Sequence, residues 1–416
     1  MTSKVRFSKT VSDCQVCSNL DLKPFLFLGY LPPVNEMVKV GSAIEERPSF
    51  PTQLLFCDQC KLVQLSTAVD QDILFPPEYP YTSGMTKILH DNFQNLQIES
   101  SELLDFSDNK KVIDIGSNDG TLLSKFQAAG FNVHGIEPTG TAKLAIAKGI
   151  PTENAFFSPQ VAEKVKTNFG VARFVTATNV FAHIDDIHNI IKGIKILIDE
   201  KGVFCSENHY LGSLVETLQY DTIYHEHLRY YSVTTLKYLL EKNGLEIFRV
   251  KKIPTHGGSI RVYSAKKGLY PVDSSVNEIM VEEEKLCTTM PSLREFAHRV
   301  FLSKLEINSA LYSIKMANER IYGIGAPSRS STLINYVGLD ENSIDCVCEM
   351  KGSLKLDKYM PGTMIPVKEE ACLYQDQPEY AMLLSWHIAD ELIPKIKAKG
   401  FKGKFIVPLP HVRIVE

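Results

Sequence analysis

Residues Val112–Phe126 read VIDIGSNDGTLLSKF, and this stretch decides the fold that we expect. Three apolar residues surround Asp114 in the pattern of a short buried strand, and a helix begins at Thr121. Gly116 and Gly120 flank the polar turn, where a backbone without Cβ lets a ligand approach closely. The new helix presents unpaired N–H groups to that ligand. The stretch therefore predicts a nucleotide-binding strand–turn–helix unit.

The acids of this turn limit the kind of ligand. Asp114 and Asp119 would repel a pyrophosphate, which favours a ligand with a cationic or amino-acid end. A second strand-like run ends at Glu137, about 20 residues after the turn, where a carboxylate can accept both hydroxyls of a ribose. The glycine spacing alone would also suit an ordinary strand–helix connection, but the position of Glu137 favours cofactor binding.

A third apolar run at Phe174–Ala177 and the polar segment after it give the chain an order that resembles a class I S-adenosylmethionine methyltransferase. In that family the glycine turn holds the methionine part of the cofactor and the acid holds the ribose. In the same family, a loop after the fourth strand closes over the cofactor. The resemblance assigns cofactor-binding roles to Asp114, Gly116, Asn118, Asp119, Gly120, Glu137 and Asn179. Phe156 would stack on the adenine or be a core aromatic.

The length and composition describe an ordinary protein of two or three domains. The chain has 416 residues, and 44% of them are hydrophobic, enough for a core in each domain. A net charge of −4 and a pI near 6.3 give no reason to expect nucleic acid as a partner. We see no signal-peptide pattern and no run near the ~18 apolar residues of a membrane helix. We expect a soluble, cytoplasmic protein without a membrane partner.

The spacing of the cysteines predicts a metal site. Nine cysteines are too few and too unevenly placed for a disulfide framework. Cys14 and Cys17 form one CxxC turn, and Cys57 and Cys60 form another. Each turn lets two thiolates face one tetrahedral ion at ~2.3 Å. We expect the four to bind a structural zinc ion with no open position for catalysis; two unrelated reduced pairs are the alternative.

The order of patterns predicts three domains. These are a zinc-binding domain over 1–84, a cofactor-binding domain over 85–270 and a second Rossmann-like α/β domain over 271–416. In the last, the turn GIGAPSRSST at 323–332 places Gly325, Ser328 and Arg329 where N–H groups and a guanidinium could hold a phosphate. Alternatively, this turn carries no ligand. His256 precedes two glycines, and we expect it to line the cleft between the halves.

One polar segment, YDTIYHEHLRYYS at 220–232, separates the chain from common methyltransferases. Two histidines, a glutamate and several tyrosines are hard to explain as core, although a solvated loop remains the alternative. Together with the four cysteines, HGGSIRVY at 256–263 and the 323–336 turn and helix, the segment makes the chain similar to nucleotide-sugar (TDP-sugar) 3-C-methyltransferases. The resemblance covers essentially the whole chain. It implies methylation of C-3 of a nucleotide-linked 4-keto-deoxysugar.

The implied reaction needs a base beside a carbon α to a ketone and a donor for the enolate oxygen. A histidine suits the first task, and tyrosine hydroxyls suit the second. The family motif favours His227 as the base, with His225 as its competitor. The other expected catalytic residues are Glu226, which orients the sugar or the imidazole, and Tyr224, Tyr79 and Tyr81 around the oxyanion.

Two alternative functions, from other classes of protein, fit the sequence less well than a sugar C-methyltransferase. An RNA methyltransferase would usually carry a basic surface, whereas this chain is slightly acidic. A protein that only binds a nucleotide sugar would leave the glycine turn and Glu137 without a purpose. Thr82–Gly84 and Ser328–Ser330 depart from the family pattern, so the sequence leaves the nucleotide and the sugar open. It also leaves the oligomeric state open.

Overall fold

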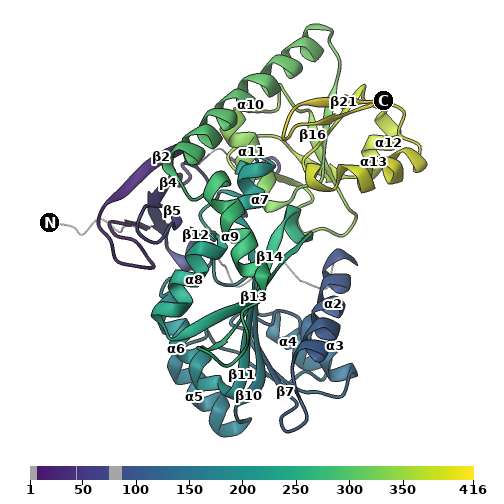
Figure 1. The fold of residues 1–416 in the computed structure, drawn as a ribbon. Coiled ribbons are helices and arrows are strands. Elements are labelled where there is room, and N and C mark those ends of the chain that lie inside the picture. The colour runs from purple at the N-terminus through teal and green to yellow at the C-terminus, as the bar shows by residue number, and fades with distance from the viewer. Residues whose placement is uncertain (1–6, 44, 75–86) are drawn as a thin grey trace, which may run out of the picture.

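The computed structural model describes residues 7–43, 45–74 and 87–416, which build a four-stranded, a seven-stranded and a six-stranded sheet, two small two-stranded sheets and the covering helices (Figure 1). Two expected catalytic residues, Tyr79 and Tyr81, lie outside the described residues. Within the described part of the chain, none of the helices combines the length and the apolar character that spanning a bilayer requires.

The first unit is a small antiparallel sheet that carries the four cysteines. Its elements are β1 (Ser8–Thr10), β2 (Leu22–Leu31), β3 (Val38–Lys39), β4 (Phe50–Cys57), β5 (Val63–Leu65), β6 (Thr67–Val69) and α1 (Gln71–Leu74). The main sheet has the order β12-β5-β4-β2, and β12 (Arg229–Tyr230) comes from the histidine-rich segment. Arg229 pairs with Gln64 and Tyr230 with Val63. The first unit therefore holds this segment by backbone hydrogen bonds.

The middle unit is a seven-stranded sheet between helices. Its elements are α2 (Lys87–Leu103), β7 (Lys111–Ile115), α3 (Thr121–Ala128), β8 (Asn132–Ile136), α4 (Ala142–Ala147), β9 (Thr152–Glu153), α5 (Pro159–Asn168), β10 (Ala172–Thr178), α6 (Ile187–Leu197), β11 (Ile198–His209), α7 (Leu211–Glu216), η2 (Tyr220–Thr222), α8 (Val233–Lys242), β13 (Leu245–Ile253), η3 (Thr255–Gly257) and β14 (Ser259–Lys266). The strand order is β13-β14-β11-β10-β7-β8-β9, and β14 runs antiparallel to both of its neighbours. The predicted α/β fold is confirmed.

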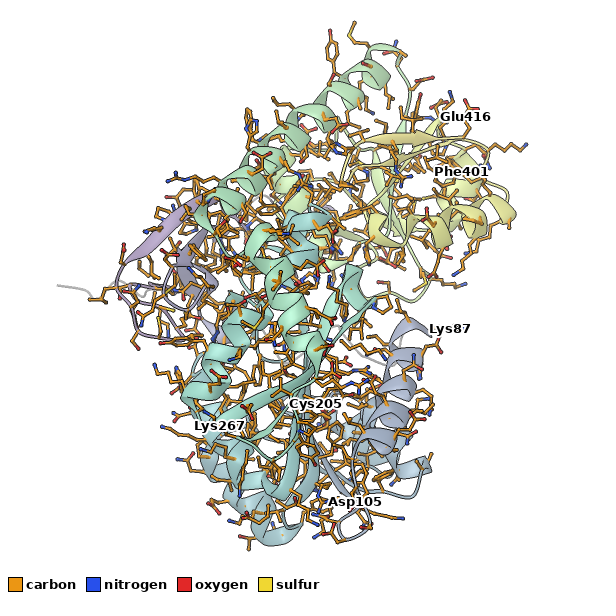
Figure 2. The ribbon with its side chains drawn as sticks, viewed as in Figure 1. Lys87, Asp105, Cys205, Lys267, Phe401 and Glu416 are labelled. Atoms are coloured by element: carbon orange, nitrogen blue, oxygen red, sulfur yellow. The ribbon has the colours of Figure 1, made fainter. Side chains whose placement is uncertain are left out.

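The sequence explains why the central strands lie inside. Val112, Ile113 and Val175 on β7 and β10 are fully buried, as expected for parallel strands that helices cover on both faces. Figure 2 shows side chains filling the space between sheet and helices, with Cys205 of β11 in the interior. Because β7, β8, β10 and β11 are parallel, their carboxyl ends meet at one edge, where ligands bind in open α/β sheets.

The third unit is the second Rossmann-like domain that the sequence predicted. It contains α9 (Ser274–Leu286), α10 (Met290–Met316), β15 (Ile321–Ile324), α11 (Ser328–Val337), β16 (Cys346–Glu349), β17 (Lys358–Tyr359), β18 (Val367–Glu369), α12 (Ala371–Asp376), β19 (Tyr380–Leu383), η4 (Trp386–Ile388), α13 (Ala389–Ala398), β20 (Lys404–Val407) and β21 (Arg413–Val415). The sheet order β18-β16-β15-β19-β20-β21 is the Rossmann order 3-2-1-4-5-6. Only β17 leaves this sheet among the described strands of the unit, and it pairs with β3 of the first unit.

A buried ion pair joins the third unit to the histidine-rich segment. The Arg329 guanidinium donates from Nε and Nη2 to the two carboxylate oxygens of Asp221, each at 2.7 Å. Trp386 Nε1 donates to the same carboxylate at 2.7 Å. Asp221 is fully buried, so its charge depends on these donors.

Replacing Arg329 with Met should lower the free energy of unfolding by about 3–5 kcal/mol, because it leaves the Asp221 carboxylate buried without its cation. Chemical denaturation followed by circular dichroism measures this loss. The control is Lys395→Met, which removes an exposed ion pair with Glu391 and should cost roughly 0–1 kcal/mol. Equal losses of unfolding free energy in the two variants would contradict the conclusion that Arg329 neutralises a buried carboxylate.

Candidate active site

The glycine turn after β7 packs closely against the loop that follows β10. Gly116 has a φ of +72°, and a Cβ there would lie 2.5 Å from Cγ2 of Val180. Asn118 also adopts a left-handed conformation, with a φ of 49°. Its backbone N–H donates to Glu137 Oε2 at 3.0 Å, so the turn and the end of β8 form one structure. Only glycine fits at position 116 without moving the loop after β10.

Buried acids gather beneath this turn. The Glu137 carboxylate is 4% exposed and also accepts hydrogen bonds from the Thr139 N–H at 2.8 Å and hydroxyl at 2.6 Å. Burial raises the pKa of Asp114 to about 8, and the neighbouring carboxylates of Glu137 and Glu207 add to this effect, while a hydrogen bond from Thr176 opposes it. A carboxylate at the end of the second strand and an acidic turn flanked by two glycines fit S-adenosylmethionine, whose ribose hydroxyls and cationic end need acceptors.

The remaining expected cofactor residues lie around the same edge in different roles. Asp119 accepts from the Thr121 hydroxyl at 2.7 Å and from Lys148 Nζ at 2.9 Å, so its carboxylate fixes the start of α3. A Cβ on Gly120 would lie 3.1 Å from Ala145 and from Ile150, which places this glycine in a tight helix contact.

Two further expected cofactor residues lie on loops. Phe156 follows β9 and is 66% exposed. Asn179 follows β10 in a left-handed conformation, with a φ of 57°. Its side-chain Nδ2 lies 3.3 Å from Nε2 of His256, which is also left-handed at a φ of 55°. Strained positions of this kind cluster where a structure holds a ligand.

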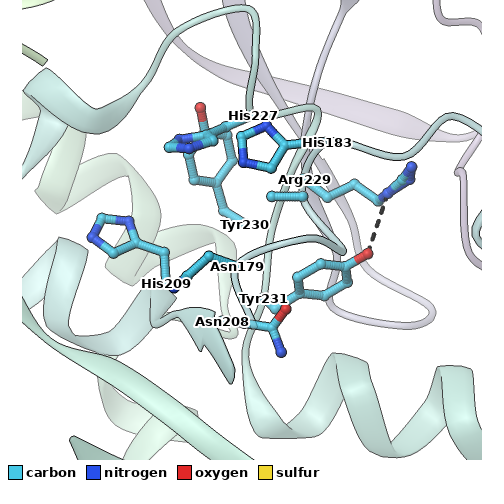
Figure 3. A pocket seen from close by; sticks show the side chains of 9 residues that line it. Asn179, His183, Asn208, His209, His227, Arg229, Tyr230 and Tyr231 are labelled. Carbon is cyan, nitrogen blue, oxygen red and sulfur yellow. Dashed lines mark hydrogen bonds between the residues drawn. The ribbon is translucent and has the colours of Figure 1, made fainter. Parts of the chain in front are cut away.

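A small cavity opens beside Asn179, and histidines dominate its wall (Figure 3). Its lining residues are Asn179, Ala182, His183, Asn208, His209, His227, Arg229, Tyr230 and Tyr231. Figure 3 shows the His227 and His183 rings side by side, with His209 on another wall. The carboxyl ends of β10 and β11 supply Asn179, Asn208 and His209, so the sheet edge itself forms part of the cavity.

The hydrogen bonds of His227 fix its tautomer. Nδ1 lies 2.9 Å from the Thr222 carbonyl oxygen, which can only accept, so Nδ1 carries the proton. Nε2 is then the basic nitrogen. The ring packs against Tyr224 at 4.2 Å and His183 at 5.0 Å between centroids. This is the arrangement of a held general base.

His183 and Glu226 support the same group of side chains. His183 Nδ1 donates to the Glu226 carbonyl at 2.7 Å. The buried Glu226 carboxylate accepts from Asn35 Nδ2 at 2.7 Å, and Asn35 Oδ1 accepts from the Ser328 hydroxyl at 3.2 Å. Residues from all three units thus meet at Glu226.

His225 points elsewhere. Its Nε2 lies 3.2 Å from the Thr52 hydroxyl, and its ring meets Phe50 edge to face at 5.6 Å. It is 1% exposed and does not line the cavity. Two histidines separated by one residue therefore face different neighbours, a distinction that spacing alone does not make.

Burial keeps the histidines of this region neutral. It lowers the pKa of His183 and His256 to about 4 and that of His209 to about 3. Burial also lowers the pKa of His227 well below its usual value, and His183 and His209 add to the effect. The pKa of Tyr224 is raised by burial, so its hydroxyl stays protonated. At neutral pH the site offers unprotonated imidazoles beside a phenol donor.

The turn after β15 faces the same region from the third unit. Gly325 has a φ of +78°, and its N–H donates to the Cys348 carbonyl at 2.9 Å. Lys355 Nζ donates to the Ala326 carbonyl at 2.6 Å, and burial lowers the pKa of this amine. Arg329 at the start of α11 is bound to Asp221, as described above.

Sequence reasoning gave no site role to His183, His209 or Lys355. His209 is the last residue of β11 and His183 lies in the loop after β10, which is a usable signal because ligands bind at the carboxyl ends of parallel strands. Lys355 lies after β16 in a loop with no motif of its own, so only the fold brings it to the turn.

The four N-terminal cysteines converge on one point. Their sulfur atoms lie within 4.8 Å of one another, with Cys14 and Cys60 at 3.3 Å and Cys17 and Cys57 at 3.4 Å. A tetrahedral ion with ~2.3 Å bonds would separate its sulfurs by about 3.8 Å, so the cluster fits zinc. Four protein ligands close the coordination sphere, and the ion stabilises this unit.

The strand order, the acidic glycine turn and the cysteine cluster define a class I S-adenosylmethionine-dependent methyltransferase with a zinc-binding unit. Three families match in turn: "Putative zinc binding domain" at 14–75, "Methyltransferase domain" at 88–250 and "C-methyltransferase C-terminal domain" at 254–410. The chain is 31% identical over 414 residues to the C-methyltransferase NovU of Streptomyces niveus, which covers 98% of each chain. The chain belongs to this C-methyltransferase family and is an S-adenosylmethionine-dependent enzyme.

Solved methyltransferase structures match part of this chain. A methyltransferase from Anabaena variabilis is 16% identical and covers 42% of this chain and 84% of its own, with a TM-score of 0.33. Magnesium protoporphyrin IX methyltransferase of Synechocystis with bound S-adenosylmethionine is 15% identical and covers 43% of this chain and 78% of its own, with a TM-score of 0.32.

Replacing Glu137 with Gln should weaken S-adenosylmethionine binding by roughly tenfold to a hundredfold, because a hydrogen bond to a charged acceptor contributes about 1.5–3 kcal/mol. Titration calorimetry measures this change. The matched control is Glu153→Gln, which alters a carboxylate of β9 that is bound to Lys164 at 2.8 Å. Unchanged affinity in the Glu137 variant would remove this carboxylate from the cofactor site.

Proposed function

We propose that the enzyme methylates C-3 of a nucleotide-linked 4-keto-deoxysugar through an enolate, with His227 as the base. The observation that carries the proposal is the neutral His227 imidazole, whose Nδ1 is held by the Thr222 carbonyl in a cavity at the carboxyl ends of β10 and β11. Asn179 lines this cavity, and the next residue, Val180, packs on Gly116 of the glycine turn. The proposed base and the proposed cofactor turn are thus neighbours.

The first step is removal of a proton from carbon. His227 Nε2 takes the proton from the carbon next to the ketone, and the bond electrons move to the ketone oxygen. The Thr222 carbonyl accepts from Nδ1–H and stabilises the imidazolium that forms. S-adenosylmethionine supplies an electrophilic methyl group for the carbon.

The negative charge on the enolate oxygen needs donors. The Tyr224 hydroxyl is protonated and its ring lies 4.2 Å from that of His227, so we assign it to this oxygen. Tyr79 and Tyr81 are assigned to the same oxygen on the family resemblance alone. Glu226 is assigned to orient the sugar, because its carboxylate is fixed by Asn35.

The C-terminal turn is assigned to the nucleotide diphosphate. Gly325 lets the backbone turn at a φ of +78°, and Ser328 supplies a hydroxyl at the start of α11. Arg329 acts through Asp221, since its guanidinium holds the segment that carries His227. His256 lies beside Asn179, where the sugar would approach the cofactor.

The domain boundaries are part of the proposal. The cofactor-binding unit over 85–270 is supported by β14, which ends at Lys266, and by α9, which begins at Ser274. The zinc-binding unit covers 1–84 and the nucleotide-sugar unit 271–416.

Replacing His227 with Asn should lower kcat by 10²-fold to 10⁴-fold, the usual contribution of a general base, and leave cofactor affinity unchanged. Labelled S-adenosylmethionine and a panel of 4-keto nucleotide sugars measure transfer. Loss of deuterium from C-3 without cofactor measures the proton step alone. The control His225→Asn should keep both activities, because His225 faces Thr52. The reverse result would assign the base to His225.

The acid limb of kcat/KM should have its midpoint below pH 6.5. The active form of His227 is deprotonated, and burial lowers its pKa, so the base stays available to a lower pH than a free imidazole would. Rates at pH 5–8, with folding checked at each pH by circular dichroism, test this. A midpoint at or above 6.5 would contradict a buried neutral base.

A further inference from the structure

A second cysteine group lies in the third unit, outside the cavity and the zinc cluster. Cys346 and Cys348 are two residues apart on β16, so their side chains point to the same face of the sheet. Cys372 belongs to α12, which packs on β16. The three sulfur atoms lie within 4.8 Å of one another, and those of Cys348 and Cys372 are 3.5 Å apart.

The second cysteine group is mostly buried, but one of its three side chains is partly exposed to solvent. Cys346 is 0% exposed and Cys348 is 1% exposed, whereas Cys372 is half-buried. All three are free thiols. A ligand that needs shielding from water and an entry path from one side would find both here.

The spacing of the sulfurs suits a three-coordinate ion. Three ligands arranged in a plane around an ion at ~2.3 Å are about 4 Å apart. The sulfurs of Cys348 and Cys372 are 3.5 Å apart and all three sulfurs lie within 4.8 Å of one another, so small side-chain rotations would bring them to that distance. The strand and the helix already supply the arrangement.

The number of ligands selects the ion. Thiolates favour soft ions such as Cu(I), zinc and the iron of iron–sulfur clusters. Structural zinc and iron–sulfur sites use four ligands. Among residues 7–43, 45–74 and 87–416, no fourth histidine, cysteine, aspartate or glutamate joins this group. We propose that Cys346, Cys348 and Cys372 bind one Cu(I) ion through three sulfurs.

Charge and connections fit this assignment. Lys368 on β18 pairs in register with Cys348, which places a cationic residue beside thiolates that carry more charge than Cu(I) neutralises. Binding releases the thiol protons and ties the short helix α12 to the sheet. The Cys348 carbonyl accepts from the Gly325 N–H, so the bound ion would also stiffen the strand beneath the C-terminal turn.

The test is an anaerobic competition for Cu(I) between the zinc-loaded full chain and a coloured Cu(I) chelator. The native protein should withdraw one Cu(I) per chain, while element analysis shows that zinc is retained. Cys346→Ala and Cys372→Ala should each abolish this uptake. The controls Cys205→Ala and Cys287→Ala remove buried cysteines of neither cluster and should bind as the native chain does.

Three results would overturn the proposal. They are no uptake by the native chain, uptake only with loss of zinc, and full uptake by Cys372→Ala. If Cys346→Ala does not fold, Cys372→Ala decides the question, because its side chain is half-buried on a short helix. The thermal midpoint of each variant without copper shows whether it is folded.

Discussion

The buried carboxylate of Asp221 is the constraint on which the site depends. It lies at the start of the segment that carries His227, and it is held by Arg329 and Trp386 of the third unit. At the other end of the segment, Arg229 pairs with the sheet of the zinc-binding unit. The proposed base, His227, is therefore held by two units that do not belong to the cofactor-binding sheet. Under the proposed mechanism, the zinc-binding unit and the Rossmann-like unit would contribute to catalysis by holding one short stretch of irregular backbone.

Sequence patterns predicted the parts of the fold that local periodicity determines. Strands β7, β8 and β10 follow from apolar runs, and they lie where expected. The pairing of strands that are distant in sequence could not be predicted from local apolar patterns. The insertion of β14 between β11 and β13, the pairing of β12 with β5 and that of β17 with β3 depend on contacts between distant residues.

The same difference between local sequence patterns and long-range contacts applies to the residues of the candidate site. The glycine turn and Glu137 are close in sequence to the elements that position them, so spacing was informative. The difference between His227 and His225 comes from what each ring meets, a cavity or Thr52, and that is tertiary information. The sequence also did not indicate that Arg329 binds Asp221, because no local sequence pattern marks a buried ion pair between residues 108 positions apart.

The neutral state of the histidines in the cavity follows from the opposing demands of burial and of the proposed proton transfer. A base that is deprotonated before the substrate arrives leaves no unpaired charge in a buried space, which would otherwise cost several kcal/mol. In the proposed mechanism, charge appears only when the proton moves from carbon to His227, and imidazolium and enolate form together as a pair. The Thr222 carbonyl faces Nδ1 of this imidazole, and the Tyr224 ring packs on it at 4.2 Å between centroids. Burial lowers the strength of the base, so the enolate must be stabilised by donors that are already in place. The close packing of Tyr224 on His227 is what this requirement predicts.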